Sequence, residues 1–283
     1  MGTAGRQIRG LMLSIERYGD VERVIMWTRR SMSVGYHVSA YVTRGVVIDT
    51  GFPAIGREFV QWLEAATPRG VIVTHAHEDH AGNVDLVARL NVPMQMTPGT
   101  LAELQGAKGI GLYRLYVWGR PRRVPDGLKA GHVDEPALVM VHTPGHSADH
   151  HVVWDAEREH LFGADLFLGV KVRVLAPWED PRTHAASLRA AIALRPKRLF
   201  DAHRGLIMDP IGALTAKADW IEGTVAAIER RLAEGWSHRA IAREVLGREG
   251  SLRLLTGGEY SRTNFVASVA SPRDPAPSQT RPR

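Results

Sequence analysis

One short segment, residues 74–82 (THAHEDHAG), concentrates histidine and acidic side chains. Imidazole and carboxylate groups are typical protein ligands of Zn²⁺ and related metal ions. Residues i and i+2 of an extended chain point the same way, so His75 and His77 can bind one ion. Asp79 and His80 follow where the chain must turn, and Gly82 permits a tight path because it has no Cβ. The segment therefore predicts a metal site.

Three further residues of the same kinds follow predicted strands by a few positions. They are His146, in the turn 142–147 (HTPGHS), together with Asp165 and His203. Layered α/β proteins gather their ligands in loops at strand ends, so these three are candidates to complete the site. His150 follows the same turn and is interpreted as a packed core histidine, with a supporting contact to the site as the alternative.

The apolar pattern predicts strands that alternate with helices, which is typical of a layered α/β core. Strands are predicted over residues 21–27, 37–42, 45–49, 70–74, 92–96, 137–141, 151–154, 160–162 and 198–202. Helices are predicted over residues 55–66, 84–90 and 183–194, and Asn83 is the expected N-cap of the second.

Beyond residue 212 the pattern becomes helical. An apolar stripe with spacings of 4, 3 and 4 runs from Ile221 to Leu232. Ser237 is the expected N-cap of a second helix over 238–246, and Ser261 that of a third. We therefore expect a catalytic domain over 1–212, a helical C-terminal domain over 213–270 and a disordered, proline-rich tail over 271–283.

Composition narrows the classes of function. The 283 residues include 13 histidines and no cysteine, which excludes disulfides, thiolate metal sites and a cysteine nucleophile. Lys and Arg exceed Asp and Glu by 6. No uncharged apolar stretch approaches the roughly 18 residues of a membrane span, and the apolar run 11–13 is too short for a signal peptide. We expect a cytoplasmic protein.

The metal-site motifs also carry a family resemblance. The HxHxDH segment, the TPGH turn, the lone aspartate and the late histidine resemble the metallo-β-lactamase-fold hydrolase superfamily over about residues 20–210. That resemblance implies a four-layer αββα sandwich, followed here by a smaller helical domain. It also implies a structural role for the turn Asp49-Thr50-Gly51 under the site. The implied ligands are His75, His77 and His146 for one ion, Asp79, His80 and His203 for the other, and Asp165 as the bridge.

Such a ligand set implies a binuclear metal-dependent hydrolase. Two divalent ions are expected, Zn²⁺ first and Fe or Mn as alternatives, because histidine and carboxylate suit all three. Two ions about 3.5–4 Å apart lower the pKa of a bridging water to roughly 7, so a metal-bridging hydroxide can attack an activated carbonyl. Asp79 is the candidate catalytic residue, because its carboxylate can orient the hydroxide or accept its proton.

Residues 104–125 contain basic and aromatic side chains but no acidic one. The basic residues are Lys108, Arg114, Arg120, Arg122 and Arg123, and the aromatic ones are Tyr113, Tyr116 and Trp118. One interpretation is an electropositive wall that steers an anionic substrate, with Tyr113 and Arg114 as candidate contacts. The alternative is a solvated basic surface whose aromatic side chains lie in the core.

A second pair of basic residues, Lys171 and Arg173, follows Asp165. The segment resembles the part of glyoxalase II whose basic residues help to bind the glutathione portion of a thioester, so both are candidate substrate contacts. Alternatively, they form the exposed side of an alternating strand.

The expected substrate is a thioester or another anionic acyl compound. The alternatives are a lactonase, a phosphodiesterase or ribonuclease, and a mononuclear-iron persulfide dioxygenase. The helical C-terminus and residues 143–150 also resemble the lactamase-β-2-like branch, which includes RNA-cleaving members. The C-terminal helices of this chain are interpreted as a cap over the cleft rather than as a DNA-binding module, because their basic and acidic residues nearly balance. The expected partner is a small anionic molecule; nucleic acid is less favoured, a membrane is not expected, and a homodimer is an open alternative.

Overall fold

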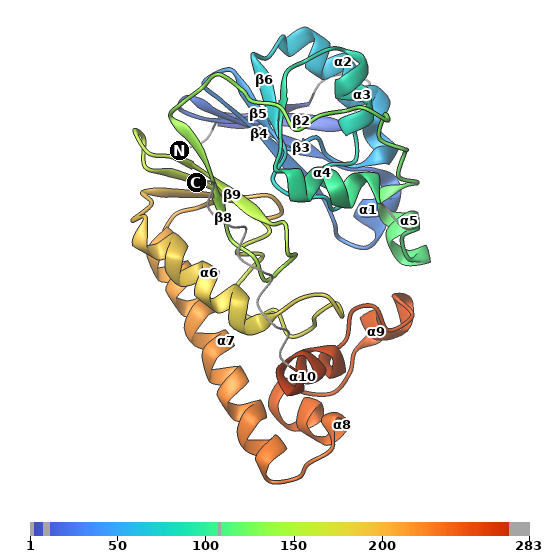
Figure 1. Ribbon diagram of the computed structural model, residues 1–283, viewed down its shortest axis with the longest axis vertical. Coiled ribbons are helices and arrows are strands. Elements are labelled where there is room, and N and C mark those ends of the chain that lie inside the picture. The colour runs from blue at the N-terminus through green and yellow to red at the C-terminus, as the bar shows by residue number, and fades with distance from the viewer. Residues whose placement is uncertain (1–2, 8–11, 107–108, 272–283) are drawn as a thin grey trace.

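A computed structural model describes residues 3–7, 12–106 and 109–271. Two β-sheets lie face to face in it, and helices cover their outer faces (Figure 1). The predicted four-layer αββα sandwich with additional C-terminal helices is confirmed. Lys108 and residues 272–283 of the predicted tail lie outside the described residues.

The first sheet holds seven strands in sequence order. They are β1 (Thr3–Gln7), β2 (Leu13–Tyr18), β3 (Val21–Met26), β4 (Val38–Thr43), β5 (Val46–Ile48), β6 (Gly70–Ile72) and β7 (Met94–Gln95). The strands from β1 to β5 pair antiparallel, whereas β5, β6 and β7 pair parallel. Parallel neighbours need long crossovers, and here these carry helices. The helices along this half are α1 (Arg29–Ser33), α2 (Gly56–Ala66), α3 (Val84–Arg89), α4 (Pro98–Gln105) and α5 (Leu112–Trp118).

The second sheet has the order β12-β11-β10-β9-β8. Its strands are β8 (Leu138–His142), β9 (His151–Asp155), β10 (His160–Ala164), β11 (Arg198–Asp201) and β12 (Gly205–Ile207). The helices that follow are α6 (Pro181–Ala193), α7 (Pro210–Ala233), α8 (His238–Ile241), α9 (Ser251–Leu255) and α10 (Arg262–Ala270). A π-helical turn, Ala242–Leu246, continues α8.

Three apolar clusters fill the three interfaces between the four layers. Tyr41 and Ile48 of the first sheet meet Phe162 and Phe200 of the second. Phe59 of α2 belongs to the cluster on the outer side of the first sheet. The third cluster joins the second sheet to α6, α7 and α10. Because each sheet is apolar on both faces, the sandwich requires a helical layer on each side.

The C-terminal helices pack directly on the second sheet's helical layer. Leu214 and Ile221 of α7 and Phe265 of α10 share a cluster with Leu188 of α6. Ser237 and Ser261 accept hydrogen bonds from backbone N–H groups of the following turns, so both predicted N-caps are confirmed. A division of the chain at residue 212 stays a prediction.

Some predicted elements differ in the structure. The strand expected over 92–96 shortens to β7, and the helices α1, α4, α5 and α9 were not predicted. Asn83 occupies the N-cap position of α3 without capping it. Its amide instead donates to the backbone oxygens of Thr50 and Phe52, which ties the helix start to the turn under the site.

None of the helices within residues 3–7, 12–106 and 109–271 combines the length and apolar character that crossing a membrane requires.

Arg44, in the turn between β4 and β5, links the two sheets. Its guanidinium donates to both carboxylate oxygens of Asp155 at the end of β9, over 2.7 and 3.0 Å. The Asp155 side chain is fully buried. Burial raises the pKa of Asp155, but the hydrogen bonds from Arg44 and from the Arg158 backbone outweigh it, so the net shift is downward.

We expect Arg44→Met to lower the free energy of unfolding by about 1–3 kcal/mol at pH 7, because a buried carboxylate loses its bidentate partner and keeps only the longer contact with Arg158. A carboxylate whose pKa is lowered in the folded state stabilises the fold at pH values above its unfolded pKa of about 3.9, and this contribution disappears as the pH falls. In urea unfolding, the substitution should therefore lower the free energy of unfolding less at pH 3.5 than at pH 7. Arg17→Met, at an exposed pair with Glu22, is the control, and an equal loss at both pH values would contradict the assignment.

Candidate metal centre

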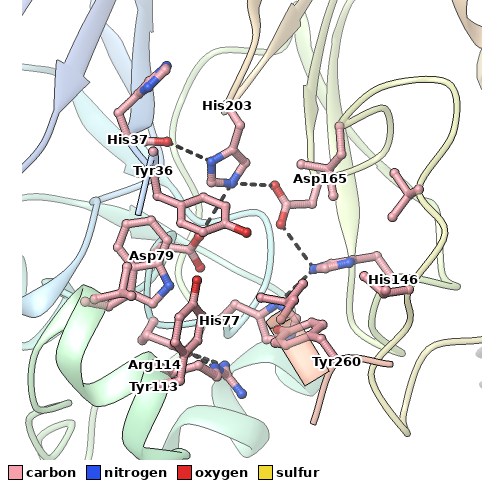
Figure 2. A pocket seen from close by; sticks show the side chains of 18 of the residues that line it. Tyr36, His37, His77, Asp79, Tyr113, Arg114, His146, Asp165, His203 and Tyr260 are labelled. Carbon is pink, nitrogen blue, oxygen red and sulfur yellow. Dashed lines mark hydrogen bonds and ion pairs between the residues drawn. The ribbon is translucent and has the colours of Figure 1, made fainter. Parts of the chain in front are cut away.

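The predicted site residues come from four loops at one end of the sandwich. His75, His77, Asp79 and His80 lie between β6 and α3. His146 lies between β8 and β9, Asp165 directly follows β10, and His203 lies between β11 and β12. The structure brings all seven side chains together, and Figure 2 shows Asp165 between His203 and His146.

The turn Asp49-Thr50-Gly51 fixes the first of these loops. The Asp49 carboxylate accepts hydrogen bonds from the Thr74 N–H and hydroxyl, over 2.8–3.0 Å. Both the backbone N–H and the hydroxyl of Thr50 donate to the His80 oxygen. Gly82 donates to the Gly51 oxygen, and a Cβ on Gly82 would collide with the Glu78 oxygen. The expected structural role of this turn is therefore confirmed.

The seven side chains form two groups that share one carboxylate. The first group is His75, His77, His146 and Asp165, and the second is Asp79, His80, Asp165 and His203. Within each group the possible ligand atoms lie within 4.8 Å of one another. The Asp165 oxygens lie 3.2 Å from Nε2 of His80, His146 and His203. Asp165 is therefore the one residue that belongs to both groups; its role as a bridge between two ions stays a prediction.

Outer hydrogen bonds decide which ring nitrogen faces the centre. Nδ1 of His80 lies 2.8 Å from Asp49 Oδ2, and Nδ1 of His146 lies 2.8 Å from Glu179 Oε1. Nδ1 of His203 lies 2.8 Å from the backbone oxygen of His37. Each ring therefore directs Nε2 inward, which is the arrangement typical of metal-binding histidines.

The inward-facing atoms fit a metal centre. His77 Nδ1 lies 3.2 Å from His75 Nε2 and 2.9 Å from His146 Nε2. Three ring nitrogens therefore face one point, where a shared cation can bind all of them. Among the described residues, His80 Nε2 and Asp165 Oδ1 are buried 3.2 Å apart, but neither makes a hydrogen bond of good geometry. Buried polar atoms without partners are costly, and metal ions would satisfy these directly. The residues present therefore fit divalent ions.

The electrostatics favour positive charge around Asp165. Burial lowers the pKa of His146 and His203, but the Asp165 carboxylate outweighs it and raises them to about 10 and about 9. The pKa of His80 is likewise raised, by Asp165, Asp79 and Asp49. Burial and neighbouring imidazoles hold the pKa of His75 well below its ordinary value. Without metal, protons on the histidines would supply the positive charge that the carboxylates need.

A cavity of about 420 Å³ opens at this centre. His77, Asp79, His146, Asp165 and His203 form its floor (Figure 2). The aromatic lining residues are Tyr36, Tyr113, Trp118 and Tyr260, and the aliphatic ones are Val117, Leu168, Val172, Val174 and Leu252. Leu252 and Tyr260 come from the C-terminal segment, so that segment closes one side of the cavity.

Two of the four predicted substrate contacts line the cavity, and two do not. Tyr113 and Arg114 line the cavity, but Arg114 is paired with Glu78 and Glu259. Lys171 and Arg173 are exposed and are not among the residues lining the cavity, which corrects their expected position. Successive residues of an extended segment point to opposite sides, and here Val172 and Val174 take the cavity side.

The expected electropositive wall over 104–125 is largely neutralised. Arg122 pairs with Asp85 over 2.9 Å and also donates to backbone oxygens of Pro53 and Gly82. Arg123 pairs with Asp126, and Arg114 with Glu78. The acidic partners lie outside the segment, so its own composition could not reveal them. Tyr113 and Trp118 nevertheless line the cavity, as the first interpretation required.

Two buried side chains support the backbone at and after Asp165, and only the first was considered from the sequence. His150 is buried, and its Nε2 accepts a hydrogen bond from the Asp165 N–H, which realises the alternative of a supporting contact. Lys217 of α7 is buried and donates to the backbone oxygens of Leu166 and Phe167, immediately after Asp165. Lys217 carries a sequence signal, because it lies in phase with the apolar stripe of α7.

The comparisons with known proteins agree with this geometry. The family described as "Metallo-beta-lactamase superfamily" matches residues 34–203. The "Beta-lactamase-like protein 2 homolog" of Caenorhabditis elegans is 27% identical over 172 residues, which cover 59% of this chain and 54% of that protein. The Drosophila melanogaster homolog is 29% identical over 192 residues, or 61% and 59%. The chain therefore spans little more than half the length of these curated relatives.

Solved structures share the fold. A metallo-β-lactamase from Erythrobacter litoralis, solved with β-mercaptoethanol in its active site, superposes with a TM-score of 0.57 at 19% identity. The match covers 76% of this chain and 99% of that one. The mono-zinc form of FIM-1 from Pseudomonas aeruginosa gives a TM-score of 0.54 at 17% identity, covering 76% and 98%.

The environment of Lys217 yields a test of how α7 supports the Asp165 loop. Burial lowers the pKa of Lys217 to about 8, against the opposing effect of Asp201, Glu179 and Asp165. Between that value and the unfolded pKa of about 10.4, the unfolded chain binds more protons, so stability rises with pH. In the metal-free protein, the free energy of unfolding of the wild type should therefore rise relative to that of Lys217→Met by up to about 1.4 kcal/mol per pH unit in this range.

Urea unfolding at pH 7.5, 8.5 and 9.5 measures this difference. Lys197→Met is the matched control, because the Lys197 side chain is 71% exposed and pairs with Glu159 at the surface. A wild-type advantage over Lys217→Met that stays constant with pH would show that Lys217 is not held in a low-pKa environment.

Proposed function

Because the chain belongs to the metallo-beta-lactamase superfamily, whose members are generally metal-dependent hydrolases, we propose that it hydrolyses an activated acyl bond, a thioester or a similar ester. The observation that carries the proposal is the buried carboxylate of Asp165, shared by two complete groups of His and Asp ligands. Paired ligand groups with a common carboxylate suit hydrolysis by water, for which no protein nucleophile is needed.

We propose two divalent ions as cofactors, Zn²⁺ first, with Fe or Mn as alternatives. His75, His77 and His146 would hold one, and His80, His203 and Asp79 the other. A mononuclear-iron persulfide dioxygenase would need only the equivalents of His75, His146 and Asp165. The convergence of the second group, with its own outer hydrogen bonds to Asp49 and His37, favours the binuclear hydrolase.

When bound, such ions activate water at neutral pH and stabilise the oxyanion that forms on the substrate. The chain itself orients the ligands through Asp49, Glu179 and the His37 backbone oxygen. The Asp79 carboxylate lines the cavity, with Oδ2 at 3.5 Å from His203 Nε2. From there it can accept a proton from the attacking water and return it to the leaving group.

The cavity supports a small-molecule substrate rather than a nucleic acid. Its walls are mainly aromatic and aliphatic, and Arg114 and Arg122 are already paired with carboxylates. Arg204 alone is too little positive charge to follow a phosphodiester backbone. Phosphodiester binding depends on unpaired cations along the backbone path. A lactone remains the nearest chemical alternative, since it is an activated acyl ester of similar size.

The metal content and one ligand substitution test this directly. His77→Ala should lose at least about 100-fold in hydrolysis, since substituting mere supporting partners already costs 10–100-fold in metal affinity or activity. The fold should persist, because His77 lies on a loop outside the apolar clusters. Elemental analysis should find close to two metal ions per wild-type chain and fewer in the variant. His238→Ala, at an exposed position of α8, should match wild type, and an active, metal-replete His77→Ala would refute the assignment.

A substrate panel separates the classes of reaction. Metal-loaded protein is offered acyl thioesters, lactones and bis(p-nitrophenyl) phosphate, with oxygen uptake measured on a persulfide. Preferred thioester turnover supports the proposal. Rapid phosphodiester cleavage with inert esters, or oxygen consumption with one iron per chain, would overturn it.

A further inference from the structure

Two arginines line the cavity, and one of them has no carboxylate partner in the described part of the chain. Besides the proposed ligands, its charged lining residues are Glu78, Arg114, Glu179 and Arg204. Glu78 and Arg114 neutralise each other, and Glu179 accepts the hydrogen bond from His146. Arg204 is exposed, and no carboxylate of residues 3–7, 12–106 and 109–271 pairs with it. An unpaired guanidinium beside an otherwise apolar wall is suited to receive an anion.

The position of Arg204 is fixed relative to the metal centre. Its backbone N–H and that of His203 both donate to Asp201 Oδ1, over 2.7 and 2.9 Å. The Arg204 Nε–H donates to the Leu168 oxygen over 3.1 Å, and the Leu168 N–H donates to Asp201 Oδ2 over 2.8 Å. The side chain is therefore tethered to the loop that carries Asp165.

This tether leaves the rest of the guanidinium available. Only Nε is engaged by a hydrogen bond within the described part of the chain, so the two terminal nitrogens keep their four N–H donors. Gly169 beside them has no side chain, and a Cβ there would lie 3.5 Å from Nη2. The fork thus keeps open space on that side, and a planar fork of donors matches a carboxylate in a bidentate manner.

We propose that Arg204 binds a carboxylate of the substrate, and that the substrate is an acyl thioester or ester with an apolar body and a second, anionic end. This rests on the proposed function. The apolar body would lie against Leu168, Val172, Val174 and Leu252, with the scissile carbonyl over the metal centre. Arg204 thereby takes the role that the sequence assigned to Lys171 and Arg173.

Matched substrates test the proposal. One thioester carries a terminal carboxylate on the acyl chain, a second carries it on the thiol portion, and a third is the neutral methyl ester of the first. The wild type should prefer one charged substrate over the neutral one by roughly 10–100-fold in kcat/KM, mostly through KM, in keeping with a charge-assisted hydrogen bond. Which charged substrate is preferred identifies the end that Arg204 holds.

Three variants localise the effect. Arg204→Gln should lower kcat/KM for the preferred charged substrate far more than for the neutral one, which brings their ratio near unity. Arg204→Lys should restore part of the ratio, since it keeps the charge without the bidentate fork. Arg173→Gln, outside the cavity, should retain the wild-type ratio. Metal content is measured for every variant, because Arg204 adjoins His203.

The contrary outcomes are distinct. A wild type that hydrolyses charged and neutral thioesters equally, or an Arg204→Gln variant with an unchanged ratio, would overturn the role of Arg204 and leave the hydrolase intact. An equal loss on all substrates with loss of metal would make Arg204 a support for His203 instead. If neither thioesters nor esters are hydrolysed, the proposed function fails, and calorimetric binding of the charged and neutral thioether analogues still decides the role of Arg204. Equal affinities would overturn it, whereas a preference for the charged analogue that Arg204→Gln abolishes would support it.

Discussion

The attraction between the buried carboxylate of Asp165 and three imidazoles is the interaction on which the rest of the site depends. Asp165 is 5% exposed, and the neighbouring His80, His203 and His146 outweigh burial and hold its pKa well below its ordinary value. A buried negative charge is tolerated only when positive charge or hydrogen bonds compensate it. Protons on the histidines or metal ions can each supply that charge. The geometry of the whole centre follows from bringing these rings to one carboxylate.

Elements from both halves of the sandwich contribute to that convergence. The turn after β5 supplies Asp49, which fixes His80, and the segment before α6 supplies Glu179, which fixes His146. Helix α7 supplies Lys217, whose ammonium group holds the backbone just beyond Asp165. His184 of α6 lies 2.8 Å from the same Leu166 oxygen. The ligand loops are therefore rigid because partners from different elements over-determine them, which is a condition for a preorganised site.

The ligands could be predicted from sequence because their signal is local, and the family resemblance also indicated the supporting turn at Asp49, whereas supports such as Glu179 could not be predicted. Four ligands lie within six residues, and the other three follow strands. Glu179 gives no such signal, since its partner His146 is 33 positions away. The neutralisation of Arg114 by Glu78 and Glu259 likewise depends on tertiary contacts over 36 and 145 positions. Alternation around Lys171 and Arg173 indicates two faces, but periodicity alone does not say which face meets the cavity.

The ligand set bears on the type of reaction, whereas the cavity walls bear on the choice of substrate. The ligand groups come from loops at the strand ends, while the cavity walls also draw on segments that lie outside these loops. Leu252 of α9 and Tyr260, in the turn between α9 and α10, line the cavity, and Arg114 joins α5 to Glu259 across its edge. Because Arg114 is paired with both Glu78 and Glu259, it stabilises the shape of the cavity and is not free to bind an anion. Recognition of a charged substrate then falls to Arg204, whose backbone is fixed by the same Asp201 that holds His203. Substrate choice and metal geometry are thereby coupled through one buried carboxylate.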